Sequence, residues 1–315
     1  MALNLDNMLV IGIASSALFD LSESDQVFRT QGEEAYRAYQ DANLDNTLQA
    51  GVAFEFIRRL LALNEIRPDR QLVEVIVLSR NDPFTGLRVM RSVAAHQLPI
   101  TRSIFNQGAS PYRYVEALNM SLFLSANDRD VREANDQGLP AGRVLGSSSP
   151  QQQGDDRSLR IAFDFDGVIA DDESERLYQS EGIEAFREHE RTNAEIALQE
   201  GRLAKFLRGI HEIQQVEEER ARSEDDYQLQ LRVAIVTARN APADQRVVKT
   251  LESWGVRVND AFFLGGIEKS RVLRVLKPHI FFDDQLLHLD AHEDVPSVHI
   301  PFGEGNKRTQ GNDQQ

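Results

Sequence analysis

The chain repeats itself at a distance of about 150 residues, and this repeat restricts its possible folds more than any other feature. Ile11 and Ile161 begin similar apolar runs at an offset of 150. At an offset of 158 the matching pairs are Ser79 and Thr237, Gly108 and Gly266, Arg113 and Arg271, and Phe123 and Phe281. Because this period is too long for a solenoid, we expect an internal duplication of a whole α/β domain.

Apolar runs of strand length alternate with helical patterns in both halves. In the first half the strand-like runs are residues 9–14, 73–78, 100–105 and 121–124, and the helical patterns are 23–42, 51–63, 86–96 and 112–118. In the second half they are 161–163, 233–236, 261–264 and 280–282, with helical patterns at 194–213, 244–254 and 269–276. This alternation predicts an α/β fold of two tandem doubly wound, Rossmann-like domains.

The domain boundaries follow from composition. We expect a first domain over residues 1–141 and a second over residues 159–302. Residues 142–158 are rich in Ser, Gln and Gly, which is typical of a flexible linker, and residues 303–315 form a polar tail that we expect to be mobile.

The net charge of −15 argues against a nucleic-acid binder or an anionic-membrane binder, because both need clustered basic residues. The chain has no cysteine, which excludes disulfides, thiolate zinc sites and cysteine nucleophiles and is compatible with a cytoplasmic protein.

Asp6 and Asp20 flank the apolar run at residues 8–19, so we interpret it as a buried strand rather than a signal peptide. No run approaches the roughly 20 apolar residues of a membrane span, so we expect a soluble protein. A homo-oligomer remains open.

Carboxylates follow the apolar run at residues 161–163, where Asp164, Asp166 and Gly167 stand. Burying a carboxylate is costly unless a partner compensates it, and Mg²⁺ is a suitable partner for two acids at a strand end. Thr237, Lys269 and the pair Asp283 and Asp284 also stand at or just beyond the ends of strand-like runs. In a parallel sheet these ends converge at one edge, where ligands bind. The sequence therefore predicts a reaction centre at this edge.

The residue types suit phosphoryl transfer, which depends mostly on positioning and charge neutralisation. Asp164 would be the nucleophile that forms an aspartyl-phosphate, and Asp166 the general acid and base. Thr237, with the nearby backbone at Ala238, would hold a phosphoryl oxygen, and Lys269 would neutralise the phosphoryl group. The predicted metal ligands are Asp164, Asp166, Asp283 and Asp284, of which Asp283 is the better candidate in the last pair.

The first half lacks these acids. Ala14 and Ser16 stand at the positions of Asp164 and Asp166, and Ser125 and Ala126 at those of Asp283 and Asp284. We therefore expect the first domain to be a degenerate copy that supports the fold, forms a pocket wall or binds an effector.

The ordered motifs resemble those of the haloacid dehalogenase-like (HAD-like) phosphohydrolases. They are residues 163–168 (Phe-Asp-Phe-Asp-Gly-Val), Thr237 after a valine, Lys269, and residues 282–284 (Phe-Asp-Asp). Residues 164–175 and 278–285 are closer still to the type I cytosolic 5'-nucleotidase family, and residues 51–54, 110–111 and 122–126 add to this resemblance. It implies Mg²⁺-dependent hydrolysis of nucleoside 5'-monophosphates in the cytosol, with the six site residues in the roles above. Animal members place Gly and Ala where this chain has Phe165 and Gly167.

A charged, helix-rich insertion at about residues 172–228 resembles the cap of this superfamily, a lid that excludes water and selects the leaving group. Phe186, Tyr178 and Arg176 are its candidates to meet a nucleoside.

Several alternatives stay open. The substrate could be another small phosphate ester, or the chain could be a non-catalytic nucleotide-sensing protein. Arg239 is predicted to bind a substrate phosphate or a site carboxylate, and a purely structural role is equally compatible. The histidines show no paired metal spacing, so we interpret His279, His288, His292 and His299 as structural or surface residues.

Overall fold

The computed structural model describes residues 4–146, 157–289 and 295–303. The chain divides into two compact units, Met1–Asp155 and Asp156–Gln315. Residues 147–156 of the predicted linker and residues 304–315 of the predicted tail lie outside the described residues, as does His292. No helix in the described part of the chain is long and apolar enough to cross a membrane.

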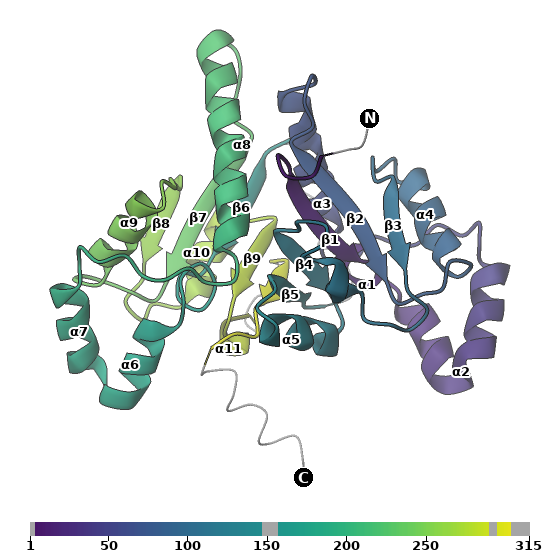
Figure 1. Ribbon diagram of the computed structural model, residues 1–315, viewed down its shortest axis with the longest axis horizontal. Coiled ribbons are helices and arrows are strands. Elements are labelled where there is room, and N and C mark those ends of the chain that lie inside the picture. The colour runs from purple at the N-terminus through teal and green to yellow at the C-terminus, as the bar shows by residue number, and fades with distance from the viewer. Residues whose placement is uncertain (1–3, 147–156, 290–294, 304–315) are drawn as a thin grey trace. The chain divides into compact units, whose positions relative to one another are not determined.

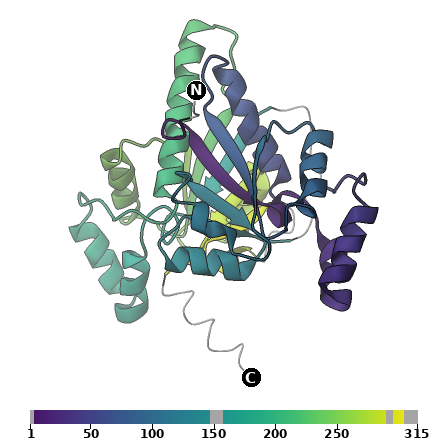
Figure 2. The same cartoon turned by 45° about the vertical axis from the view of Figure 1, so that its right-hand side comes forward.

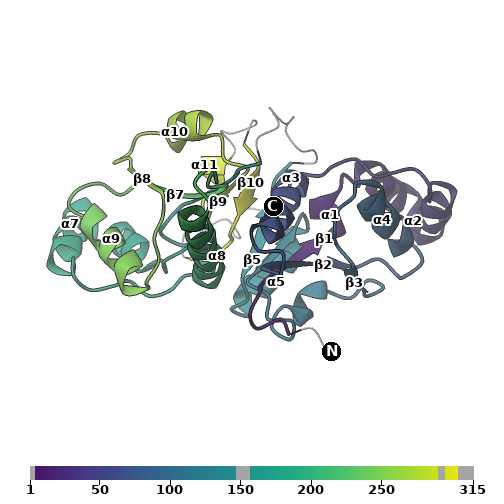
Figure 3. The same cartoon turned by 90° about the horizontal axis from the view of Figure 1, so that it is seen from above.

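The first unit contains a parallel five-stranded sheet in the order β3-β2-β1-β4-β5. Its strands are β1 (Leu9–Ala14), β2 (Val73–Ser79), β3 (Arg102–Phe105), β4 (Leu122–Ser125) and β5 (Ala141–Val144). Its helices are α1 (Ser15–Leu18), α2 (Ser22–Ala42), α3 (Phe54–Ala62), η1 (Leu63–Ile66), α4 (Gly86–Ala95), η2 (Pro111–Tyr114) and α5 (Asp128–Asp136). Every residue of β1 and β2 is buried, as expected for central strands covered on both faces. Figure 3 shows α3 and α4 on one face of this sheet and α5 on the other.

The second unit has a parallel sheet in the order β10-β9-β6-β7-β8. Its strands are β6 (Leu159–Phe163), β7 (Leu231–Thr237), β8 (Asp260–Phe263), β9 (Ile280–Asp283) and β10 (Ser297–His299). Its helices are α6 (Glu173–Glu181), α7 (Ile183–Thr192), α8 (Ala204–Ser223), α9 (Asp244–Ser253), α10 (Lys269–Leu276) and α11 (Leu286–Leu289). The prediction of an α/β fold with parallel strands is confirmed.

The two units have the same strand order when β1 to β5 are matched to β6 to β10. The match extends to buried side chains. Arg88 donates to Gln40 Oε1 at 3.2 Å in the first unit, and Arg246 donates to Glu190 Oε1 at 2.8 Å in the second. These four residues occupy equivalent positions at offsets of 158 and 150, so the likeness of the units reaches individual contacts.

Each unit carries a helical hairpin folded at a glycine. Gly32 interrupts α2 with φ +85° and ψ −174°, and Gly182 separates α6 from α7 with φ +85° and ψ −177°. Figures 1 and 2 show the two arms of α2 on either side of this bend. The helix predicted over residues 23–42 is therefore a hairpin, and a glycine permits its bend because side chains rarely adopt this backbone conformation.

Several elements differ from the sequence expectations. Residues 111–114 form only a short 3₁₀ turn, whereas a helix over 112–118 was expected, and α5 and β5 were not foreseen. The strand β5 includes the first three residues of the predicted linker. The helix expected over 194–213 begins at Ala204 and extends to Ser223.

Helix α8 belongs to the layered core, although it falls within the predicted cap. Its Phe206 ring lies 5.9 Å from the rings of Phe163 on β6 and Phe282 on β9. The apolar positions of this helix therefore reflect packing on the sheet, which a helical pattern alone does not distinguish from packing within a lid.

Candidate active site

The sharp turn after β6 fixes the position of Asp164. The Asp164 backbone N–H donates to Phe282 O at 2.8 Å, and Asp164 Oδ1 accepts from Phe165 N at 2.7 Å. Gly167 follows with φ +72°, and a Cβ atom there would lie 2.7 Å from Asp284 Cγ. The positive φ and the close approach of Asp284 both require glycine at this point.

Lys269, the first residue of α10, bridges two strand ends. Its Nζ lies 2.6 Å from Asp164 Oδ2 and 2.7 Å from Asp283 Oδ2. The three side chains are at most 7% exposed. The structure thus brings Asp164, Lys269 and Asp283 into one buried ion-pair cluster at the carboxyl edge of the sheet.

Together with the neighbouring Asp284, this cluster contains three carboxyl groups and one lysine, so the lysine cannot balance them all. Burial raises the pKa of Asp164 to about 6, although Lys269 opposes the shift. Burial also raises the pKa of Asp284 well above its ordinary value, and the nearby charges of Asp283 and Asp164 add to this effect. Asp283 is different, because Lys269 and His288 outweigh its burial and lower its pKa. Two of the three acids are therefore disfavoured as anions in the absence of a further cation.

The donor set fits a divalent metal ion. One ligand atom each from Asp164, Asp283 and His288 lie within 4.8 Å of one another. Buried carboxylate oxygens in excess of positive charge are what a hard cation stabilises. His288 Nδ1 lies 3.2 Å from both carboxylate oxygens of Asp283, so this histidine belongs to the site and not simply to the surface. Only its place five residues after Asp283 could have indicated this from the sequence.

Asp166 faces a different partner. Its two oxygens accept hydrogen bonds from Arg239 Nε and Nη2, both at 2.7 Å. The Asp166 side chain is 21% exposed, whereas that of Arg239 is 3% exposed. Of the alternatives for Arg239, the structure therefore shows it bound to a site carboxylate.

Arg239 also joins a buried network that the sequence interpretation missed. It pairs with Glu190 on α7 and donates to Ser174 Oγ at 2.7 Å, and Arg246 donates to the same glutamate at 2.8 Å. Burial opposes ionisation of Glu190, but Arg239 and Arg246 outweigh it and lower its pKa. This network ties the hairpin α6–α7 to the site. Alignment of the two halves could have indicated it, because Gln40 and Arg88 are the equivalents of Glu190 and Arg246.

The other predicted residues surround these clusters. Thr237 is buried at the end of β7, and its Oγ1 accepts from Arg239 N at 3.2 Å, whereas Ala238 is exposed. The Phe186 ring centre lies 5.8 Å from the Arg239 guanidinium carbon and 6.3 Å from the Tyr178 ring. Arg176 pairs with Asp172.

The sequence of the chain was compared with protein-family models, curated proteins and solved structures. A family model described as 5'-nucleotidase matches residues 1–307. The human protein cytosolic 5'-nucleotidase 1B is 31% identical over 299 residues, which cover 93% of this chain and 48% of the human protein. The chain thus spans about half the length of this curated relative. No solved structure matches the chain.

Proposed function

Because the chain belongs to the 5'-nucleotidase family, we propose that it hydrolyses nucleoside 5'-monophosphates to a nucleoside and phosphate. The observation that carries this proposal is the buried pairing of Asp164 with Lys269 beside Asp283. A carboxylate whose two oxygens are held by Lys269 and by the Phe165 N–H is oriented before substrate arrives, which favours nucleophilic attack.

In this mechanism an oxygen of Asp164 attacks phosphorus, and the bond from phosphorus to the 5'-oxygen breaks. The leaving oxygen takes a proton from Asp166, which has been protonated beforehand. Asp166 then takes a proton from the water that hydrolyses the aspartyl-phosphate. Lys269 stays beside the nucleophile and reduces the repulsion between Asp164 and the anionic phosphoryl group.

In this mechanism Arg239 has two competing partners, the Asp166 carboxylate and the substrate phosphate. It donates to both oxygens of Asp166, so its guanidinium is already engaged before a substrate arrives. A substrate phosphate that draws Arg239 away would leave the Asp166 carboxyl group accessible to the leaving oxygen. Thr237 and the backbone at Ala238 lie next to Arg239 and would hold a phosphoryl oxygen.

The proposed cofactor is Mg²⁺, held by Asp164 and Asp283, with Asp166 and Asp284 as the further predicted ligands and His288 beside Asp283. When bound, it would neutralise charge on the transferring phosphoryl group. The excess of buried carboxylate over positive charge supports this assignment.

The larger organisation is also part of the proposal. The two units would be tandem HAD-like domains, the second catalytic and the first a degenerate copy. The cap would be the hairpin α6–α7, whose Phe186 lies against Arg239. The human relative is named as a cytosolic enzyme, and we propose the same location here.

A substrate panel tests the function. The full chain with Mg²⁺ should release phosphate from nucleoside 5'-monophosphates faster than from sugar phosphates, and Asp164→Asn should lower that rate by about 10³-fold or more, because it removes the nucleophile. Asp225→Asn, at an exposed position, is the matched control and should keep the wild-type rate.

Each alternative gives a different result. A preference for sugar phosphates would identify another phosphate ester as the substrate class. Binding of a nucleotide without turnover would identify a sensor. An Asp164→Asn variant as fast as the wild type would exclude the aspartyl-phosphate mechanism.

A further inference from the structure

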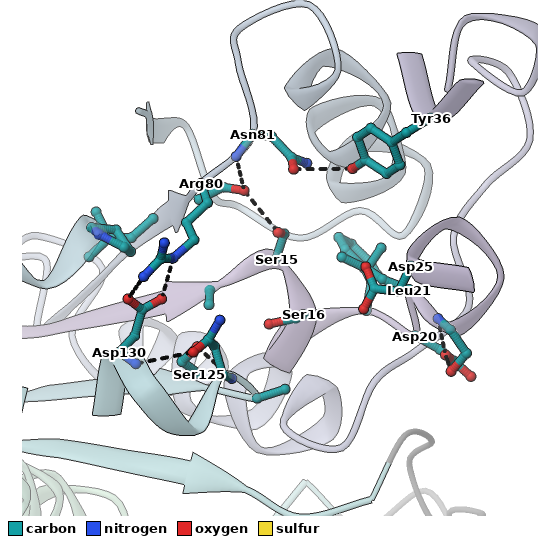
Figure 4. A pocket seen from close by; sticks show the side chains of 18 of the residues that line it. Ser15, Ser16, Asp20, Leu21, Asp25, Tyr36, Arg80, Asn81, Ser125 and Asp130 are labelled. Carbon is teal, nitrogen blue, oxygen red and sulfur yellow. Dashed lines mark hydrogen bonds and ion pairs between the residues drawn. The ribbon is translucent and has the colours of Figure 1, made fainter. Parts of the chain in front are cut away.

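The first unit has a pocket at the position that the site occupies in the second. It encloses about 370 Å³, and Ala14, Ser79 and Ser125, the last residues of β1, β2 and β4, contribute to its lining. These strands are the equivalents of β6, which is followed by Asp164, and of β7 and β9, which end at Thr237 and Asp283. Figure 4 shows the pocket, with Ser15, Ser16 and Ser125 near the strand ends.

The pocket keeps the shape of a ligand site without the groups for hydrolysis. Ala14 and Ser16 replace the two carboxylates after β6, Ser125 replaces Asp283, and Pro111 replaces Lys269. None of these four positions carries a carboxylate or a lysine, so the pocket lacks the groups proposed for the aspartyl-phosphate reaction in the second unit. A ligand bound there would therefore not be hydrolysed by that route.

The hairpin wall of this pocket matches the hairpin beside the catalytic cluster. Tyr36 on α2 is the equivalent of Phe186, and Phe28 is the equivalent of Tyr178. Both pairs of rings meet edge-on, at 5.7 Å and 84° in the first unit and at 6.3 Å and 79° in the second. Asn81 occupies the position of the longer Arg239, and the Tyr36 hydroxyl donates to Asn81 Oδ1 at 3.1 Å. The shorter asparagine leaves open the space that an arginine would fill.

Polar groups that are free to bind a ligand face this space. Asn81 Nδ2 is buried and has no hydrogen-bond partner among the described residues. Figure 4 shows the Ser16 hydroxyl without a hydrogen bond to the residues drawn, in contrast to Ser15, whose Oγ lies 3.0 Å from Ser79 Oγ. A buried donor without a partner is costly, so a ligand acceptor at Asn81 would remove a penalty.

The charges of the lining disfavour an anionic ligand. Asp20, Asp25 and Asp130 stand against Arg29 and Arg80, which gives −3 + 2 = −1 with all five ionised. Arg80 is already engaged, because it pairs with both oxygens of Asp130 and donates to Ser110 Oγ at 2.8 Å. The remaining guanidinium, on Arg29, is exposed and interacts electrostatically with Asp25. A dianionic phosphate would therefore find weak compensation.

We propose that this pocket binds a nucleoside, the uncharged product of the reaction, as an intact ligand. The ring of Tyr36 offers a surface for the base, Asn81 a donor to a ring or carbonyl acceptor, and Asp25 an acceptor for ribose hydroxyls, which carboxylates bind in nucleotide-binding folds. The choice of a nucleoside over other hydroxyl-bearing molecules rests on the proposed function, because in that proposal the equivalent hairpin of the second unit, α6–α7, contacts the nucleotide substrate.

The test is calorimetric titration of the full chain in EDTA with adenosine, guanosine, cytidine and uridine, each added separately, and with the corresponding 5'-monophosphates. We expect at least one nucleoside to bind more tightly than its monophosphate. Ser16→Tyr fills the pocket and should weaken that binding at least tenfold or remove one site from the stoichiometry. Ser223→Tyr, on an exposed position of α8, is the matched control and should bind as the wild type does.

A second variant guards against misfolding of the first. Asn81→Asp keeps an oxygen for the Tyr36 hydroxyl but replaces the buried donor by an acceptor, and it should also weaken nucleoside binding at least tenfold. The proposal is overturned if no nucleoside binds, if both variants bind like the wild type, or if the monophosphate is the tighter ligand at this pocket. Phosphate release by the same preparations with Mg²⁺ is read separately, so loss of the proposed function and loss of this site are distinguishable.

Discussion

Lys269 is a single residue whose replacement tests the charge balance of the buried cluster that it forms with Asp164 and Asp283. It is buried between Asp164 and Asp283, and these acids outweigh its own desolvation and raise its pKa. Lys269→Met keeps the length of the side chain but leaves the acids without this partner. We expect the free energy of unfolding to fall by about 3 to 5 kcal/mol near neutral pH in EDTA, the range seen when one member of a buried ion pair is removed. Urea unfolding measures this change.

The same variant should also lose activity. Removal of one preorganised electrostatic contact in an active site typically lowers turnover by about 10² to 10³-fold, and we expect a phosphate-release rate reduced by that factor. Lys249→Met is the control: Lys249 on α9 is partly exposed and forms a surface ion pair with Glu252, so its replacement should change neither stability nor rate appreciably. A Lys269→Met protein as stable and as active as the wild type would show that the cluster does not depend on this cation.

Asp164 leads to a prediction about pH. In the metal-free protein its pKa is raised to about 6, so near pH 6 about half of these carboxyls carry a proton. A divalent cation favours the anion and lowers this pKa, which releases protons. Addition of Mg²⁺ to weakly buffered protein at pH 6 should therefore acidify the solution, as a pH electrode would record.

The direction of this effect can be checked in two ways. Asp164→Asn should release fewer protons than the wild type under the same conditions. Well above pH 6 the carboxyl is already ionised, so the release that depends on Asp164 should diminish. Equal proton release by wild type and variant at pH 6 would assign the raised pKa to another group.

At the scale of elements, the two helical hairpins permit a matched comparison. Gly182 has φ +85° and ψ −177°, and a Cβ atom there would meet nothing within 4 Å. Gly182→Ala should therefore act through backbone strain alone, which in this conformation costs about 1 to 3 kcal/mol. Because α7 carries Phe186 and Glu190, we expect the altered hairpin to raise the KM for a nucleoside monophosphate more than it lowers kcat, as steady-state kinetics would measure.

Gly32→Ala is the control, because the backbone is nearly the same and nothing lies within 4 Å of its Cβ position either. It alters the hairpin of the first unit and should leave the KM close to the wild-type value. If both variants raise the KM equally, the effect is general destabilisation and the hairpin α6–α7 has no special role with substrate.

The sequence predicted the central elements well because their signals are local. The buried runs at residues 9–14 and 73–78 become β1 and most of β2, since a short apolar run between turn residues is typical of a buried strand in an α/β chain. The short strand β5 was missed because Ala141 to Val144 contains a glycine and an arginine and lacks a continuous apolar run. Helix α8 was assigned to the cap because periodicity shows that one face is buried but not what covers it.

The site was predictable in part for the same reason. Asp164 and Asp283 stand at the ends of recognisable strands and Lys269 begins the helix after β8, so the parallel fold alone implies that they converge. His288 and Glu190 could not be found in this way, because each reaches the site from a helix and through a tertiary contact. The preference of Asp166 for Arg239 likewise depends on side-chain geometry that spacing does not encode.

At the scale of the whole molecule, the two units share one strand order, with carboxylates after the central strand in the second unit and without them in the first. The first unit has Ala14 and Ser16 where the second has Asp164 and Asp166, and both units build the same five-strand order. The scaffold therefore does not require carboxylates after its central strand. This comparison predicts that the acids of the second unit serve its chemistry at some expense of stability.

The double variant Asp164→Ala, Asp166→Ser gives the second unit the residues of the first and tests this prediction. Asp283 remains to pair with Lys269, and Glu190 with Arg239, so neither buried cation loses every partner. Removal of Asp164 also relieves repulsion that contributes to the raised pKa of Asp284. We expect phosphate release to be lost while the melting temperature in EDTA stays equal to that of the wild type or rises. A large fall in melting temperature would instead show that the second unit depends on these carboxylates for folding.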